Sequence, residues 1–276
     1  MKVAVLGIGL IGGSIGFASR ARAAAHVSGW DPDPDTRARA LQLGAIDAQF
    51  PDLARAVNGA DVVFVAAPVG ALVQTARAAL DCAGPESVVS DVGSTKRAVA
   101  EAISDARFIA GHPLAGSEVS GVEHAREDLF EGAVWYLAGP PGRQPILEEL
   151  IRTFGAQPVA IDAQLHDRLM ATVSHLPHVL ANLLVAQAVS SLGEDPPSPV
   201  GMGPSFRDAT RVAGSNSAIW TDIYLSNRDA LIAAIDELTG RLAQVRAALD
   251  ARDAQAVRDW NERARAEREA LLGQGS

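Results

Sequence analysis

The stretch KVAVLGIGLIG, residues 2–12, decides the fold. Its first half, Lys2–Leu6, is a short apolar run, which predicts a buried β-strand. Its second half, Gly7–Gly12, has the GxGxxG spacing, and the residues after it predict a helix. The glycine pattern alone would be a weak signal. Between a strand and a helix, it predicts a dinucleotide-binding βαβ unit.

Each glycine of this pattern has its own physical role. Gly7 permits a tight turn, Gly9 lets the backbone approach a pyrophosphate, and Gly12 allows close contact between helix and sheet. The free N–H groups at the start of the helix attract phosphate. The predicted cofactor-binding residues are Gly7, Ile8, Gly9, Leu10, Ile11, Gly12 and Asp31.

Asp31 indicates which dinucleotide is bound. It ends the second predicted strand, 19 residues after Gly12, where a carboxylate can accept hydrogen bonds from both hydroxyls of an adenosine ribose. Asp33 and Asp35 would repel a 2′-phosphate, and Arg37, the first arginine after Asp31, follows both of them. The sequence therefore favours NAD over NADP. The alternative is a glycine-rich turn and a capping aspartate that bind no ligand.

Strand-like apolar runs alternate with helical patterns up to about residue 160. Continuous hydrophobicity with helices between the runs is typical of a parallel sheet covered on both faces. The expected helices include Asp35–Leu43 and Val69–Leu80. The expected strands are Lys2–Leu6, Val27–Trp30, Val62–Ala66, Ser87–Ser90, Arg107–Ala110, Ala133–Leu137 and Pro158–Ile161.

The pattern becomes entirely helical near Asp162. The expected helices are Ala163–Leu192, Ser217–Leu225, Arg228–Leu249 and Ala254–Leu271, with a loop over Gly193–Ser205. We therefore predict an α/β protein, in which a Rossmann-type, mostly parallel sheet domain (1–162) precedes an all-helical domain (163–276). The helical part has more apolar positions than a small bundle needs, which predicts a homodimer formed through this domain.

Composition excludes several classes of partner. The 276 residues carry a net charge of −9, which disfavours nucleic acid and anionic membranes as partners. The single cysteine, Cys82, cannot form an intramolecular disulfide, which fits a reducing cytoplasm. The glycines in residues 7–16 oppose a signal-peptide helix, and we expect no transmembrane segment. A cytoplasmic location is therefore predicted.

Two further motifs follow predicted strands: SDVGSTK, residues 90–96, and GHPLAG, residues 111–116. Open α/β sheets bind ligands at the carboxyl ends of their strands. His112 lies where a nicotinamide is expected and is a candidate general base, although a histidine in a loop often has no function. Ser94 is either a catalytic hydroxyl or the cap of the next helix.

The helical half contributes polar candidates as well. His175 and His178 in SHLPH share one helix face, and Pro177 between them should kink or start the helix. A metal site is disfavoured because no cysteine or acidic partner accompanies the pair. Asp208 and Arg211 are spaced for a surface salt bridge, but the apolar flanks of Arg211 suggest a buried guanidinium that reaches for a carboxylate.

Together these motifs resemble the prephenate/arogenate dehydrogenase family of tyrosine biosynthesis. The resemblance covers nearly the whole chain, and five motifs in order are far more specific than any one of them. It rests on GIGLIGGSIG (7–16), SDVGSTK (90–96), GHPLAGSEVSGV (111–122), SHLPH (174–178) and RDATRVAGSN (207–216). Known members have a dinucleotide-binding domain followed by a helical dimerisation domain.

The resemblance implies NAD-dependent oxidative decarboxylation of prephenate to 4-hydroxyphenylpyruvate. It implies that His112 is the catalytic histidine at the ring hydroxyl of the substrate and that Ser94 assists it there. No metal site is expected. The implied substrate-binding residues are Arg211 at a carboxylate, His178 near the side chain, Glu118 at the access to the site, and His175 and Asp208 in support. Glu118 could instead be a solvated loop residue.

Three other functions stay open. Arogenate, which carries an amino acid side chain where prephenate has a keto acid, could be the substrate. A β-hydroxyacid or imine dehydrogenase would share the two-domain plan, but that class relies on a lysine in the helical domain and no lysine follows Lys96. An NAD-binding sensor without catalysis would be expected to have lost His112 or Arg211, and both are present.

Overall fold

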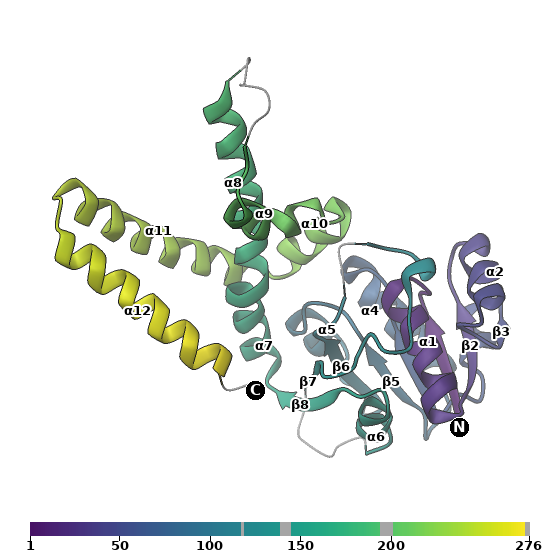
Figure 1. The fold of residues 1–276 in the computed structure, drawn as a ribbon. Coiled ribbons are helices and arrows are strands. Elements are labelled where there is room, and N and C mark those ends of the chain that lie inside the picture. Colours follow the sequence, from purple (N-terminus) through teal and green to yellow (C-terminus); the bar gives the residue numbers. More distant parts are fainter. Residues whose placement is uncertain (117–118, 139–144, 194–200, 274–276) are drawn as a thin grey trace. The chain divides into compact units, whose positions relative to one another are not determined.

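The computed structural model of the chain describes residues 1–116, 119–138, 145–193 and 201–273 (Figure 1). The chain divides into two compact units, Met1–Arg228 and Asp229–Ser276. The first unit contains the sheet together with the first helices that follow it. These units are defined by how compactly the chain packs and not by function. The domain boundary at residue 162 therefore stays a prediction.

Eight strands of the described residues form one sheet in the order β3-β2-β1-β4-β5-β6-β7-β8. Every neighbouring pair is parallel except β6 and β7, which confirms the predicted Rossmann-type, mostly parallel sheet. The strands are β1 (Lys2–Leu6), β2 (His26–Trp30), β3 (Ala48–Gln49), β4 (Val62–Val65), β5 (Val88–Asp91), β6 (Phe108–Pro113), β7 (Val134–Ala138) and β8 (Gln157–Ile161).

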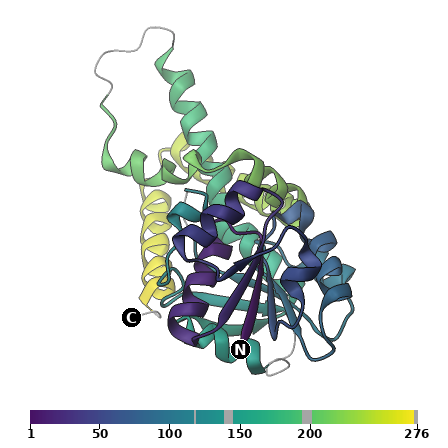
Figure 2. The ribbon, with the colours of Figure 1, turned by 90° about the vertical axis from the view of Figure 1, so that its right-hand side faces the viewer.

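Two apolar clusters hold helices on both faces of this sheet (Figure 2). Side chains alternate along β1, so Val3 and Val5 belong to one cluster while Ala4 and Leu6 belong to the other. The first face is covered by α1 (Leu10–Ala23), α2 (Pro34–Leu43) and α6 (Pro145–Thr153), and the second by α3 (Leu53–Val57), α4 (Leu72–Cys82) and α5 (Arg97–Ala102).

The strand β7 was expected, but its antiparallel direction and the short elements β3, α3, α5 and α6 were not. A parallel return to the sheet needs a crossover, usually through a helix. Between β6 and β7 the described residues contain only the short 3₁₀ turn Val122–His124, and β7 returns antiparallel with His112 opposite Tyr136. The hydrophobic pattern predicts that a strand exists but does not give its direction.

The expected helix Ala163–Leu192 contains an irregular turn. It consists of α7 (Ala163–Met170), a π-helical turn over Ala171–His175, and α8 (Leu176–Leu192). Pro177 lies in the first turn of α8, as predicted for a proline that kinks or starts a helix. Because proline has no N–H to donate, the helix changes its hydrogen-bonding pattern at this point, and wide turns of this kind are frequent at functional sites.

The helical segment of residues 163–192 is long and apolar enough, by length and composition alone, to cross a membrane; the mean hydropathy of its most apolar part is 1.4. The sequence led us to expect no such helix. One helix of this kind is weak evidence for a membrane span, because core helices of soluble proteins pass the same test. Part of its apolar surface is exposed on α8, at Leu183, Leu184, Val185 and Val189.

The remaining helices are α9 (Pro204–Thr210), α10 (Ser217–Ser226), α11 (Arg228–Asp250) and α12 (Ala254–Leu272). Asp253 caps α12, since its carboxylate accepts the N–H of Ala256 at 2.9 Å. In the unit formed by residues 229–276, large apolar side chains such as Leu242, Leu249 and Trp260 are exposed. An exposed apolar surface of this kind is typical of a chain that associates.

Candidate active site

The glycine-rich turn after β1 is shaped by close backbone contacts. Gly7 has a positive φ of 91°, and a Cβ there would meet the carbonyl oxygen of Ala66 at 2.5 Å. A Cβ on Gly12 would lie 1.9 Å from the carbonyl oxygen of Gly7. A Cβ on Gly9, which precedes α1, would have no atom of the described residues within 4 Å, so the space beside Gly9 is open. These features fit a pyrophosphate bound at the start of α1.

Asp31 lies directly after β2 and is anchored to this turn. Its Oδ2 accepts the N–H of Ile8 at 2.9 Å, and its Oδ1 accepts the N–H of Asp33 at 3.0 Å. The carboxylate lines a cavity of about 830 Å³, together with residues of α2 and the segment 121–123. The position fits the predicted contact with an adenosine ribose.

Basic groups near this cavity are engaged in other contacts. The Arg37 guanidinium donates to the carbonyl oxygens of Asp31 and Pro32. Arg39 lines the cavity but pairs with Glu123, with an Nε–Oε1 distance of 3.4 Å. The residues present therefore fit NAD better than a dinucleotide with a 2′-phosphate.

A buried ion pair joins the ends of β5 and β6. The ammonium group of Lys96 contacts the Asp91 carboxylate and donates to the carbonyl oxygen of Gly111 at 2.6 Å. Asp91 in turn accepts the N–H of Gly111 at 3.1 Å. Burial raises the pKa of Asp91 and lowers that of Lys96, while their mutual attraction opposes both shifts. The pair fixes the backbone immediately before His112.

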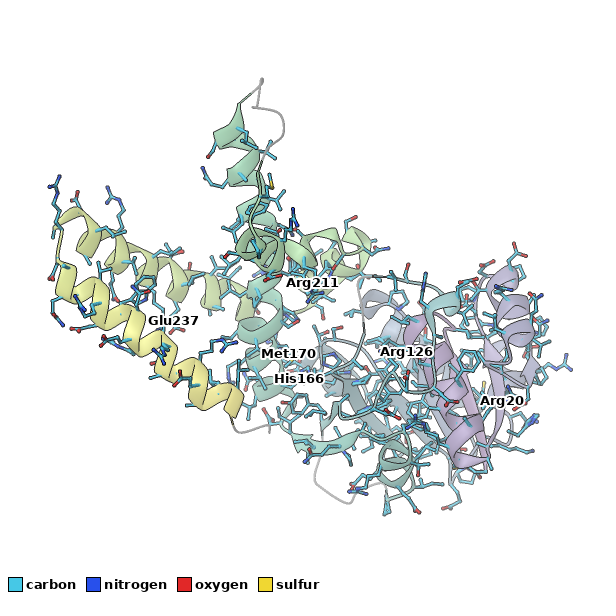
Figure 3. The ribbon with its side chains drawn as sticks, in the orientation of Figure 1. Arg20, Arg126, His166, Met170, Arg211 and Glu237 are labelled. Carbon is cyan, nitrogen blue, oxygen red and sulfur yellow. The ribbon has the colours of Figure 1, made fainter. Side chains whose placement is uncertain are left out.

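His112 lies near the end of β6 and is partly buried. Its Nδ1 is 2.9 Å from Nε2 of His166, a residue of α7. Figure 3 shows His166 on the side of α7 that faces the sheet. Burial lowers the pKa of His112 well below its usual value, and electrostatic interactions with His166, the Lys96 ammonium and His175 lower it further. His112 is therefore neutral at physiological pH.

Ser94 lies between β5 and α5 and does not cap the helix, so the capping alternative is wrong. The cap residue of α5 is Lys96, and its side chain makes no capping bond. The carboxylate of Asp167 accepts the N–H groups of Lys96 and Arg97 instead, at 2.7 and 3.0 Å. A carboxylate that is distant in sequence thus caps α5 in place of a local side chain. The Ser94 hydroxyl is therefore not needed as a helix cap.

His175 and His178 lie together in a cluster of aromatic rings. His178 stacks on Trp220 with a centroid separation of 3.6 Å, and its Nδ1 contacts the hydroxyl of Tyr224. His175 Nδ1 is 3.1 Å from Nδ2 of Asn227. Burial lowers the pKa of both histidines, that of His175 to about 4.

Trp220 also lines a cavity of about 290 Å³. Its lining residues are Gly116, Val119, Ser120, Arg211, Val212, Ser215, Asn216, Ile219 and Trp220. Arg211 is exposed, so the expected buried guanidinium is wrong: the residue begins a short 3₁₀ turn at the surface and borders an open cavity. Figure 3 shows Arg211 beside α10.

Not every predicted substrate-binding residue comes to this cavity. Asp208 is exposed on α9 and is not among the lining residues. Glu118 lies outside the described residues. Within the described part of the chain, no group of three or more histidine, cysteine or acidic side chains could hold a metal ion.

The sequence analysis missed several residues of this network. The Asp167 carboxylate lies 2.8 Å from Nδ1 of His166, within hydrogen-bond distance. The backbone carbonyl of Asp167 accepts a hydrogen bond from Nδ2 of Asn227 at 2.7 Å. The adjacent pair His166-Asp167 at the start of a predicted helix was a visible signal. Asn227 and Tyr224 gave none, because only the fold brings them to the histidines.

A glycine-rich turn for a dinucleotide, with a neutral histidine at the carboxyl end of a neighbouring strand, defines a nicotinamide-dependent oxidoreductase. Two family models identify it further: "Prephenate dehydrogenase, nucleotide-binding domain" matches residues 15–155, and "Prephenate dehydrogenase, dimerization domain" matches residues 162–262. The chain belongs to the prephenate dehydrogenase family.

Individual relatives agree with this assignment. The chain is 35% identical to prephenate dehydrogenase of Bacillus subtilis, over 92% of this chain and 72% of that protein. It is 32% identical to cyclohexadienyl dehydrogenase of Zymomonas mobilis, over 91% of this chain and 89% of that one. The structure of prephenate dehydrogenase from Aquifex aeolicus with hydroxyphenyl propionate and NAD⁺ matches with a TM-score of 0.91, 26% identity and 98% coverage of both chains.

These findings confirm the predicted family, the fold class and NAD as the cofactor. The chain is an NAD-dependent dehydrogenase of a family that acts in tyrosine biosynthesis, and its helical part matches a dimerization domain. The role of each site residue stays a prediction.

Proposed function

We propose that the chain oxidatively decarboxylates prephenate to 4-hydroxyphenylpyruvate, with His112 as the group that receives the hydroxyl proton. The observation that carries this proposal is a neutral His112, held by His166 at the end of β6. The same network reaches the cavity of Arg211 through Asn227, His175 and Trp220. In the proposed site, His112 is the proton acceptor for a ring hydroxyl and Arg211 is the cation for a carboxylate.

Residues of the turn Gly7–Gly12 and Asp31 would hold NAD, whose nicotinamide supplies a hydride acceptor. As the carbinol C–H bond of the substrate breaks, His112 takes the proton of the hydroxyl while the carbinol becomes a carbonyl. The ring carboxylate then leaves as carbon dioxide, and its bonding pair completes the aromatic ring. His112 returns the proton to the ring oxygen, so the reaction releases no net proton.

Aromatisation supplies the driving force, so the protein mainly positions the substrate. Arg211 binds a substrate carboxylate, and Ser94 assists His112 at the ring hydroxyl. His178 contacts the side chain: its ring stacks on Trp220, which lines the cavity of Arg211. His175 and Asp208 act in support, and Glu118 acts at the access to the site.

The further organisation follows from the same assignment. Residues 1–162 form the nucleotide-binding domain, and residues 163–276 form a homodimer with a second copy of the chain. Exposed apolar side chains on α8 and in residues 229–276 support this interface. A dimer that covers the α8 surface also accounts for its hydropathy without a membrane, and we place the protein in the cytoplasm.

The test is the absorbance of reduced nicotinamide, with purified protein, prephenate or arogenate, and NAD or NADP. We expect turnover of prephenate with NAD. Turnover of arogenate alone would keep the mechanism and overturn the proposed substrate. No turnover in any combination, with NAD still bound, would overturn the catalytic function and favour an NAD-binding sensor.

A further inference from the structure

A chain of hydrogen bonds leads away from His112 into the helical part of the first unit. Nδ1 of His112 contacts Nε2 of His166, and Nδ1 of His166 contacts Oδ1 of Asp167, at 2.9 and 2.8 Å. His166 and Asp167 are 0% and 2% exposed, so neither touches solvent to any extent. Buried polar groups that are linked in this way impose proton positions on one another.

Asp167 is the fixed end of this chain. Its carboxylate also accepts the N–H groups of Lys96 and Arg97, and its backbone carbonyl accepts Nδ2 of Asn227. Although burial opposes it, the hydrogen bonds from His166, Lys96 and Arg97 lower the pKa of Asp167. Asp167 is therefore ionised and can only accept a hydrogen bond from His166.

The proton positions then follow in order. Nδ1 of His166 carries a proton and donates a hydrogen bond to the Asp167 carboxylate. A neutral His166 therefore has a free lone pair on Nε2. That lone pair must accept the hydrogen bond from Nδ1–H of His112. In a neutral His112 the remaining ring nitrogen, Nε2, then has the lone pair. Among the described residues no hydrogen bond reaches this atom.

We propose that His166 and Asp167 are positioning residues that keep His112 in its Nδ1–H tautomer, which leaves Nε2 as the proton acceptor for the reaction. This proposal rests on the proposed function, because the tautomer matters only if His112 receives the hydroxyl proton. The opposite arrangement, a doubly protonated His166 that donates to Nδ1 of His112, would put the proton on Nε2 and block that role.

The first test measures the tautomer directly in the free protein at neutral pH. Imidazole nitrogen NMR shifts distinguish a protonated ring nitrogen from one with a lone pair, and the variant His112→Asn assigns the signals. We expect a proton on Nδ1 and none on Nε2 in both His112 and His166. A proton on Nε2 of His112, or on both nitrogens of His166, would overturn the proposal.

The second test compares two substitutions of the same buried residue. In His166→Gln, the amide oxygen can occupy the position of Nε2 and accept the Nδ1–H of His112, whereas His166→Met offers no acceptor of similar strength. For His166→Met we expect turnover to fall about 100-fold, the lower end of what a positioned base contributes, with the KM for prephenate and the Kd for NAD little changed. His166→Gln should recover most of the turnover and the wild-type tautomer of His112.

A role of His166 in packing alone predicts the reverse order, since methionine fills a buried apolar site better than glutamine. Equal losses in both variants, or a His112 tautomer that is unchanged in His166→Met, would overturn the proposal. The tautomer is measured without substrate, so the two failures are distinguishable. Wild-type turnover with the opposite tautomer overturns the positioning role alone, whereas the expected tautomer without turnover of prephenate or arogenate overturns the proposed function.

Discussion

The two halves of the candidate site are built in opposite ways. The cofactor turn is made of backbone: Gly7 and Gly12 are packed so closely that a single Cβ would collide with a carbonyl oxygen. The histidine cluster is made of side chains from β6, α7, the π-helical turn, α8 and α10, joined by hydrogen bonds and stacking. A backbone requirement restricts the residue type locally, whereas a side-chain network depends on the whole fold.

The largest effect on activity should come from His112, the residue of the histidine cluster that is proposed to accept the proton. His112→Asn should reduce turnover by about 10²–10⁴-fold, because it removes the proton acceptor, while NAD binding at the glycine turn stays intact. Steady-state rates and an NAD titration measure the two quantities. His124→Asn, at an exposed histidine, is the control. Unchanged turnover in His112→Asn would exclude this residue from catalysis. The histidine cluster would then not be the catalytic half of the site, as opposed to the cofactor-binding half.

The strand, turn and helix around Gly7–Gly12 could be predicted from the sequence because a backbone requirement restricts residue types locally. The glycines and Asp31 lie where a strand, a turn and a helix follow one another, so the contacts are local and the pattern reports them. Local motifs singled out His112, His175 and His178, and the resemblance to a family implied their roles, but neither identified their partners. His166 touches His112 across 54 residues of chain, and Asn227 touches His175 across 52. No local pattern predicts such contacts.

The cofactor turn can be tested by comparing two of its glycines. A Cβ in Gly12→Ala would lie 1.9 Å from a backbone oxygen, so the unfolding free energy should fall by about 3 kcal/mol and NAD binding should be lost. In Gly9→Ala, no described atom lies near the new methyl group, so stability should be nearly unchanged while NAD binding weakens. Urea unfolding and NAD titration of both variants measure this.

Equal stability of the two glycine variants would contradict the close packing of Gly12 against the turn. Normal NAD affinity in Gly9→Ala would contradict the assignment of the open space beside Gly9 to the pyrophosphate. Either result would weaken the claim that the turn is specified by its backbone.

The histidine cluster should make the stability of the protein sensitive to acid. Burial lowers the pKa of His175 from 6.5 to about 4, so the unfolded chain binds a proton at this residue over a pH range in which the folded chain does not. Stability contributed in this way is present above pH 6.5 and decreases as the pH falls towards 4. Over this range the loss from His175 is at most about 3 kcal/mol.

Urea unfolding at several pH values checks the effect, with His175→Asn compared against His124→Asn. The wild type and His124→Asn should lose stability more steeply between pH 6.5 and 4 than His175→Asn does. Parallel curves for all three proteins would mean that His175 is protonated equally in the folded and unfolded chains, which contradicts its burial.

The smallest effect should come from Arg211, where the cluster meets solvent. Arg211→Ala removes a charge-assisted contact with a substrate carboxylate that is already made in the ground state, so KM should rise while turnover changes little. Such contacts contribute about 1.5–3 kcal/mol, or roughly 10–100-fold in KM. Because Arg211 is exposed, solvent screens the interaction and the lower end of this range is expected.

Two further variants separate charge from shape at this position. Arg211→Lys keeps the charge without the planar fork and should give an intermediate KM, whereas Arg207→Ala, on an exposed residue outside the cavity lining, should leave KM unchanged. A loss of turnover with a normal KM in Arg211→Ala would mean that the guanidinium acts only in the transition state. In that case the exposed rim would take part in the chemistry as His112 does, and the division of the cluster into a buried reacting end and an exposed binding end would be wrong.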